Sequence, residues 1–130
     1  MAQLSKIYSD LDLRFNPQPG TKDVSLSYDD QAVIRSIKNL LLTNEYERLW
    51  SPTIGSRVTH LLFEPLTPLV ASSLEEEIKR VIINWEPRAQ IQSIEVKPNV
   101  DQNYYVVSLY LYISNQTTPS GIQLILKRTR

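Results

Sequence analysis

The hydrophobic residues of this chain repeat with two different periods, and the change from one period to the other falls at Pro87. From Thr67 to Pro87, apolar residues recur every three or four positions, which is the spacing of one face of an α-helix. Thr67 followed by Pro68 is a typical helix start, because threonine can cap the helix and proline is favoured at its first position. The predicted apolar stripe consists of Val70, Leu74, Ile78, Val81, Ile82 and Trp85.

Beyond Pro87, apolar and polar residues alternate, as they do in strands that bury one face. Two stretches rich in turn-forming residues, 98–103 and 115–121, separate three such segments and are too short for a helical crossover. We therefore predict a three-stranded antiparallel meander whose opposite face carries Tyr110 and Tyr112. The alternating apolar residues are Ile94 and Val96, then Val107, Leu109, Leu111 and Ile113, and finally Ile122, Leu124 and Leu126.

A second helix is predicted from Asp29, as its N-cap, to about Thr43, because apolar residues again recur with helical spacing. Residues 44–59 show no period and indicate a structured loop, and residues 58–63 a short helical turn. The apolar face of the helix consists of Val33, Ile34, Ile37, Leu40 and Leu41.

The predicted fold class is α+β, with two main helices packed on a C-terminal three-stranded antiparallel meander. Turn formers between short apolar pieces around Leu11, Leu13 and Phe15 indicate an extended N-terminal arm. The whole chain, residues 1–130, is expected to form a single domain. It divides into an arm (1–28), a helical part (29–88) and a β meander (89–130).

Composition excludes several classes of function. Fourteen basic residues balance fourteen acidic ones, so we expect neither nucleic acid nor membrane as a partner. The chain has no cysteine and a single histidine, His60, so we expect no metal site, no cofactor and no thiol chemistry. Gly20, Gly55 and Gly121 are isolated, so no phosphate-binding loop is predicted. No apolar run is long enough for a signal peptide or a membrane helix, and we expect a soluble protein.

Charged residues on the helix that is predicted from Thr67 indicate a solvated face, whereas two other carboxylates raise the alternative of a catalytic site. Glu75 with Lys79 and Glu76 with Arg80 have the spacing of exposed ion pairs. A muramidase-type glycoside hydrolase would need two carboxylates, for which Glu64 and Glu86 are the candidates. Neither has clustered aromatic and polar neighbours in the sequence, so we interpret the chain as a non-enzyme and keep the hydrolase as the alternative.

Several short motifs resemble the baseplate wedge family of contractile phage tails. The family also includes a type VI secretion subunit and often carries a "lysozyme-like" label. The Glu-Pro-Arg tripeptide after a long amphipathic helix and before a meander is the most specific of them. The matching residues are Ile7-Tyr8-Ser9-Asp10, Ser36-Ile37-Lys38-Asn39-Leu40-Leu41, Thr43, Glu47-Arg48, Pro52, Gly55, Leu62-Phe63-Glu64 and Glu86-Pro87-Arg88.

The resemblance implies a structural subunit, or sheath initiator, at the junction of wedge, tube and sheath. Its implied partners are other wedge proteins, the tail sheath protein, and tube or hub proteins. Its implied location is the tail baseplate of a virion assembled in the host cytoplasm, or the cytoplasmic baseplate of a bacterial secretion system.

The resemblance also implies that Glu86, Pro87 and Arg88 dock on a helical bundle of neighbouring wedge proteins. An internal alternative remains, in which Arg88 binds Glu47 or Glu86 binds Arg48.

The last predicted strand ends the meander and is therefore an edge to which an arm of a sheath subunit can add. The basic end, Lys127, Arg128 and Arg130, either guards this edge against aggregation or steers an acidic arm. The expected binding residues are Ile122, Gln123, Leu124, Ile125, Leu126, Lys127 and Arg128.

Overall fold

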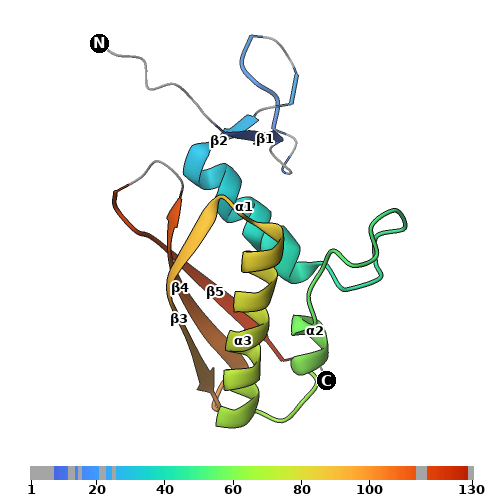
Figure 1. Ribbon diagram of the computed structural model, residues 1–130, viewed down its shortest axis with the longest axis vertical. Coiled ribbons are helices and arrows are strands. Elements are labelled where there is room, and N and C mark those ends of the chain that lie inside the picture. The colour runs from blue at the N-terminus through green and yellow to red at the C-terminus, as the bar shows by residue number, and fades with distance from the viewer. Residues whose placement is uncertain are drawn as a thin grey trace.

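The computed structural model describes residues 8–11, 14, 16–20, 23–24, 26–113 and 117–128. Its architecture is α+β, as predicted, with a three-stranded antiparallel sheet at the C-terminal end (Figure 1). The elements are β1 (Ser9–Leu11), β2 (Leu26–Tyr28), α1 (Asp29–Leu42), α2 (Val58–Leu61), α3 (Pro68–Trp85), β3 (Ala89–Asn99), β4 (Tyr104–Ile113) and β5 (Ser120–Lys127).

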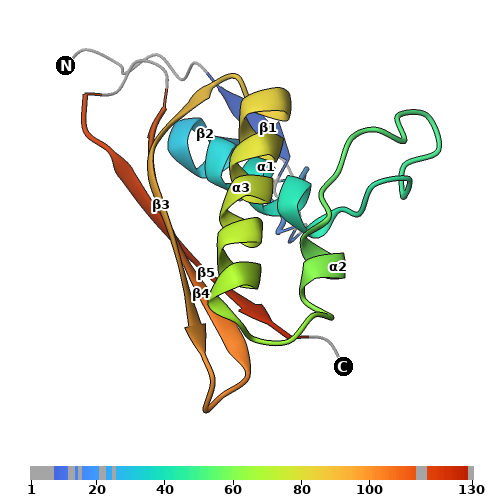
Figure 2. The same ribbon diagram turned by 60° about the horizontal axis from the view of Figure 1, so that its bottom comes forward.

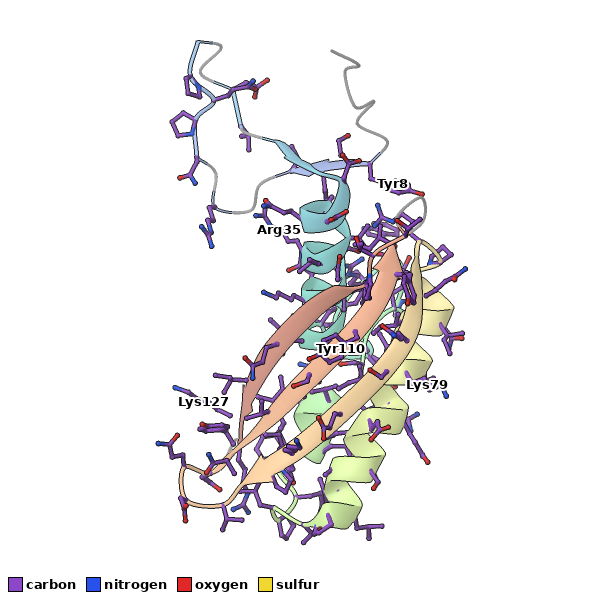
Figure 3. The ribbon with its side chains drawn as sticks, turned by 90° about the vertical axis from the view of Figure 1, so that its left-hand side faces the viewer. Tyr8, Arg35, Lys79, Tyr110 and Lys127 are labelled. Carbon is purple, nitrogen blue, oxygen red and sulfur yellow. The ribbon has the colours of Figure 1, made fainter. Side chains whose placement is uncertain are left out.

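The sheet has the strand order β3-β4-β5, which confirms the predicted meander. The helices lie on one of its faces, and Figure 3 looks onto the other face, where Tyr110 is exposed. The first turn is shorter than predicted, because Pro98 and Asn99 still pair with Tyr105 and Tyr104. The strand ladder therefore extends further toward the hairpin than the turn-forming residues indicated.

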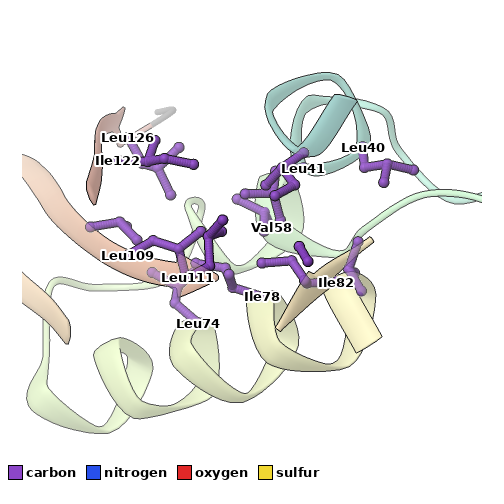
Figure 4. Close-up of a cluster of buried hydrophobic side chains, with 14 of the residues drawn as sticks. Leu40, Leu41, Val58, Leu74, Ile78, Ile82, Leu109, Leu111, Ile122 and Leu126 are labelled. Atoms are coloured by element: carbon purple, nitrogen blue, oxygen red, sulfur yellow. The ribbon is translucent and has the colours of Figure 1, made fainter. Parts of the chain in front are cut away.

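The hydrophobic core lies between the helices and the inner face of the sheet (Figure 4). Every second residue of β4 from Tyr105 to Ile113 is buried, and Ile122 and Leu126 of β5 join them. Burying a leucine or isoleucine side chain stabilises the fold by about 1.5–3 kcal/mol. The helix-facing side of the sheet is thus committed to the core, which leaves the other face and the strand edges for partners.

The start of α3 is the one predicted, whereas the start of α1 differs. The Thr67 hydroxyl accepts a hydrogen bond from the Val70 N–H at 3.2 Å, and Pro68 is the first helical residue. Asp29 was expected to be the N-cap, but it is itself the first residue of α1, and its φ is 47°. Its carboxylate accepts a hydrogen bond from the Tyr8 N–H at 3.2 Å, which ties the start of the helix to the arm.

The described part of the arm folds back on itself, as β1 and β2 pair antiparallel with Ser9 opposite Tyr28. The arm residues Leu13 and Phe15 lie outside the described residues.

The ion pairs of α3 differ from those that the spacing predicted. Arg80 binds Glu77 at 2.6 Å and Glu45 at 2.8 Å, not Glu76, and no ion pair joins Glu75 to Lys79. Glu45 also binds Arg57 at 3.0 Å. The helix face therefore does more than meet solvent, since it fastens the loop between α1 and α2 to α3.

Candidate docking site

The Glu86-Pro87-Arg88 corner lies where α3 turns into β3. The Glu86 N–H still donates to the Ile82 carbonyl at 2.9 Å, and Pro87 then ends the helix. The Glu86 side chain is 2% exposed. Arg88 donates two hydrogen bonds to it, from Nε to Oε1 at 2.5 Å and from Nη2 to Oε2 at 2.9 Å. The pair is therefore satisfied within the chain, as the internal alternative held, but Glu86 and Arg88 bind each other where the sequence suggested Arg48 and Glu47.

The electrostatics of the corner keep Glu86 ionised. Burial by itself raises the pKa of Glu86. Hydrogen bonds from Arg88 and Ser36 and the charge of Arg88 together lower it by more than burial raises it, so the pKa lies below its ordinary value. The hydrogen bonds that Arg88 donates to Glu86 correspondingly raise the pKa of Arg88. The corner is a charged pair with one member buried and the other, at 30% side-chain exposure, accessible to a partner.

Arg88 also joins the corner to the N-terminal arm. Its guanidinium carbon lies 5.3 Å from the centroid of the Tyr8 ring, a cation–π distance. Tyr8 is in turn held by the first residue of α1, as its carbonyl accepts the Asp29 N–H at 2.8 Å. Three parts of the chain, the arm, the start of α1 and the end of α3, thus meet at this corner (Figure 3 labels Tyr8).

The Glu86–Arg88 pair should make folding stability sensitive to acid. Because the folded pKa of Glu86 lies below its ordinary value of 4.5, the pair stabilises the fold above that pH and stops doing so as the pH falls through the folded pKa. We expect Glu86→Gln to lose stability at pH 7 and to show a shallower loss of stability below pH ~4.5. Urea unfolding of both proteins across this pH range measures the difference, and parallel curves would contradict it.

The outer edge of β5 presents backbone groups to solvent. Arg128 N–H donates to the Asn103 carbonyl at 3.2 Å, and the β4–β5 register runs without a shift. Hydrogen-bonded and non-hydrogen-bonded pairs alternate along an antiparallel ladder. The even-numbered residues of β5 therefore bond to β4, whereas the N–H and C=O groups of its odd-numbered residues point outward. Within the described residues no strand pairs with this side.

The side chains of the predicted β5 binding residues divide between two faces. Ile122 and Leu126 are buried in the core, and Leu124 is half-buried on the same face. Arg128 is half-buried too, and Arg130 lies outside the described residues. The exposed residues of the predicted set are Gln123, Ile125 and Lys127.

The other edge of the sheet is β3, which was not recognised as an edge from the sequence. Its geometry disfavours pairing with a further strand. Its register shifts between Ile91 and Ser93, which interrupts a regular ladder. Pro98 lies opposite Tyr105, a position whose N–H would point outward, and proline has none to offer. A bulge and a proline are devices by which edge strands avoid pairing with another chain. Of the two edges, β5 is the open one.

The candidate catalytic carboxylates have different environments. Glu64 is exposed and Glu86 is buried against Arg88. His60 is exposed on α2. Within the described ranges, no group of three His, Cys, Asp or Glu side chains could hold a metal ion, and no helix is long and apolar enough to cross a membrane.

The chain is an α+β domain with one open sheet edge and one charged corner, and both features suit contacts with other proteins. Residues 27–119 match the family of the baseplate wedge protein gp25. The chain is also 31% identical over 109 residues to baseplate wedge protein gp25 of Enterobacteria phage T4, covering 84% of this chain and 82% of that protein. The chain therefore belongs to the gp25 family of baseplate wedge proteins, and it is a baseplate component of a contractile tail or a related particle.

Solved structures share the fold. A chain of the anti-feeding prophage baseplate has a TM-score of 0.65 at 19% identity, covering 95% of this chain and 87% of that one. A chain of the post-contraction pyocin R2 baseplate has a TM-score of 0.61 at 21% identity, covering 88% and 97%. A protein from Geobacter sulfurreducens with the provisional name tail lysozyme has a TM-score of 0.69 at 20% identity, covering 75% and 89%. At these identities the likeness concerns the fold alone.

Proposed function

We propose that this wedge protein is a structural subunit that docks on neighbouring wedge proteins and starts tail sheath assembly at the edge of β5. The observation that carries the proposal is the asymmetry of the two sheet edges. The outer side of β5 offers N–H groups at Gly121, Gln123, Ile125 and Lys127, whereas β3 is interrupted by a bulge and Pro98. An extended arm of a sheath subunit adds to β5 as a further strand, held by backbone hydrogen bonds.

Strand addition explains how one subunit can start a polymer. Backbone groups supply the affinity. The exposed side chains of Gln123, Ile125 and Lys127 contact only the side chains on the same face of the added strand. The test is sheath polymerisation on assembled baseplates, scored by electron microscopy, with a β5 edge that cannot pair. Deleting the strand after Gly121 is a poor test, because it also removes the core residues Ile122 and Leu126.

The Glu86-Pro87-Arg88 corner is the proposed docking point on the wedge. A guanidinium presents five N–H donors in a planar fork, and Arg88 is exposed enough for a partner carboxylate or helix end to approach it. Pro87 is exposed beside it and has a fixed φ, so the corner keeps its shape. Tube or hub proteins are the remaining partners that we expect at this junction.

The alternative is a muramidase-type glycoside hydrolase. It requires a protonated carboxylic acid, which needs a raised pKa. The pKa of Glu86 is lowered and Arg88 occupies both of its oxygens, so Glu86 is poorly suited to this role. We therefore propose that the protein is not an enzyme.

We expect the purified chain to release no soluble fragments from peptidoglycan above a buffer control, with a known muramidase as the positive control. The physical reason is that the Glu86 carboxylate is bound by Arg88 through both oxygens and its pKa is lowered, so it is poorly suited to act as the general acid. Cell-wall turnover that disappears in Glu86→Gln, with the far-UV circular dichroism unchanged, would overturn the non-enzyme proposal.

A further inference from the structure

Residues 43–57 form a loop between α1 and α2; ion pairs fasten its base to α3, and the rest of the loop projects from the body (Figure 2). Three of its large, mainly apolar side chains are exposed to solvent. Tyr46 is 79% exposed, Leu49 92% and Trp50 96%. Soluble proteins seldom leave such a group of large side chains in water unless a partner covers it.

The loop is held in one shape by its own backbone. The Ser56 N–H donates to the Thr43 carbonyl at 2.8 Å and closes the base. The Tyr46 N–H donates to the Pro52 carbonyl at 2.8 Å and closes the tip, so that Leu49 and Trp50 lie in the short segment between these two residues. Backbone hydrogen bonds thus bring the two ends of the loop together.

Side chains and a glycine fix the base further. The Ser56 hydroxyl donates to the Leu41 carbonyl at 2.7 Å, and the Glu45 carboxylate joins Arg57 to Arg80 of α3. Gly55 has a φ of 152°, and a Cβ there would lie 2.7 Å from the backbone of Asn44. The chain thus uses a glycine and an ion-pair network to hold an apolar tip away from its own core.

A preordered aromatic tip is suited to binding because little conformational freedom is lost when a partner covers it. Tryptophan and tyrosine are also the residue types that most often dominate binding energy at protein interfaces.

The charges of the loop indicate the character of the partner. Glu45 is neutralised by Arg57 and Arg80, and the Glu47 carboxylate accepts the Asn44 N–H at 2.8 Å. Arg48, next to the apolar tip, is exposed and forms no ion pair in the described part of the chain. The complementary surface is an apolar pocket with a carboxylate on its rim.

Arg48 also connects the tip to the docking corner. It lines a hollow of about 380 Å³ together with Trp85, which immediately precedes Glu86, and with Ser36, the hydrogen-bond partner of Glu86. The loop and residues adjoining the corner therefore flank the same hollow, which is consistent with one neighbour contacting both.

We propose that the tip of the 43–57 loop, with Trp50 and Leu49 as anchors and Arg48 as its charge, inserts into an apolar, acid-rimmed pocket of a neighbouring wedge protein. The inference rests on the proposed docking function and adds a second contact to the Glu86-Pro87-Arg88 corner. The loop orients the subunit on the wedge, so that the corner alone does not have to fix its rotation.

The test compares Trp50→Ala with Leu69→Ala, a matched control at the exposed start of α3, 77% exposed. The probes are the wedge proteins of the same tail, purified singly and in complex, with binding measured by calorimetry. Trp50→Ala should weaken binding about 30-fold or more, as expected for an interface hot spot. Arg48→Glu should weaken it about tenfold, since like charges would then face each other. Leu69→Ala should change it less than about twofold.

The unfolding curve of Trp50→Ala should match that of the wild type, because the side chain makes few contacts within the chain. Unchanged wedge binding by Trp50→Ala, while a variant of the Glu86–Arg88 corner loses it, would overturn the loop inference and leave the docking function standing. If baseplates that contain Trp50→Ala assemble normally but grow no sheath, the loop contacts the sheath. If the wild type self-associates and Trp50→Ala abolishes this, the loop binds a second copy of the chain. Either result overturns the proposed partner.

Discussion

Proline at Gln123 or at Ile125 should leave the domain folded and stop sheath growth, whereas proline at Leu124 should unfold the domain. The N–H groups of Gln123 and Ile125 point away from β4, so proline at either position removes only the donor offered to an added strand. The N–H of Leu124 points to Val107 of β4. Losing it leaves a buried carbonyl unpaired at a cost of about 1–3 kcal/mol, to which steric strain adds.

The measurement is the fraction of baseplates that carry a sheath in electron micrographs, after each variant is shown to incorporate. Gln123→Ala and Ile125→Ala are the matched controls, because they change the same side chains but keep the backbone donors. Full-length sheaths on baseplates with Gln123→Pro would mean that β5 is not the nucleating edge.

Periodicity accounts for most of the predicted fold. The apolar stripe of α3 and the alternation in β4 each place their residues on one face without reference to the rest of the chain. The predicted helices and the strands of the meander therefore agree with the structure except at their ends, whereas the short strands β1 and β2 of the arm were not predicted. At Asp29, contacts with the distant Tyr8 determine where the helix starts, and at Pro98 the ladder with Tyr105 continues through a residue that usually marks a turn.

The candidate sites could be predicted only in part, because they depend on where side chains point and on which strands lie at the edges of the sheet. The sequence singled out Glu86 and Arg88, but spacing does not show that the two side chains turn back on each other across Pro87. It identified β5 as an edge, whereas β3 became the other edge only through the strand order. Trp50 lies in a stretch without a period, and such a stretch carries no signal for whether an aromatic side chain is buried or exposed.

Arg88→Ala should destabilise the domain as well as weaken docking, because it leaves the buried Glu86 carboxylate without its partner. Removing one member of such a pair costs about 3–5 kcal/mol when both are buried, and the partial exposure of Arg88 reduces this to about 1–3 kcal/mol. Failure of Arg88→Ala to enter the wedge would therefore not separate a docking role from an internal one.

The double variant Glu86→Gln with Arg88→Met separates the two roles. It removes the guanidinium without leaving a buried charge, and glutamine can still accept a hydrogen bond from Ser36, so most of the stability lost in Arg88→Ala should return. Urea unfolding measures this recovery, and co-purification with the wedge proteins measures docking. We expect the double variant to be folded and yet absent from assembled wedges, since the fork that a partner would bind is gone. A folded double variant that enters wedges as well as the wild type would show that the Glu86–Arg88 pair only closes the corner and contacts no partner.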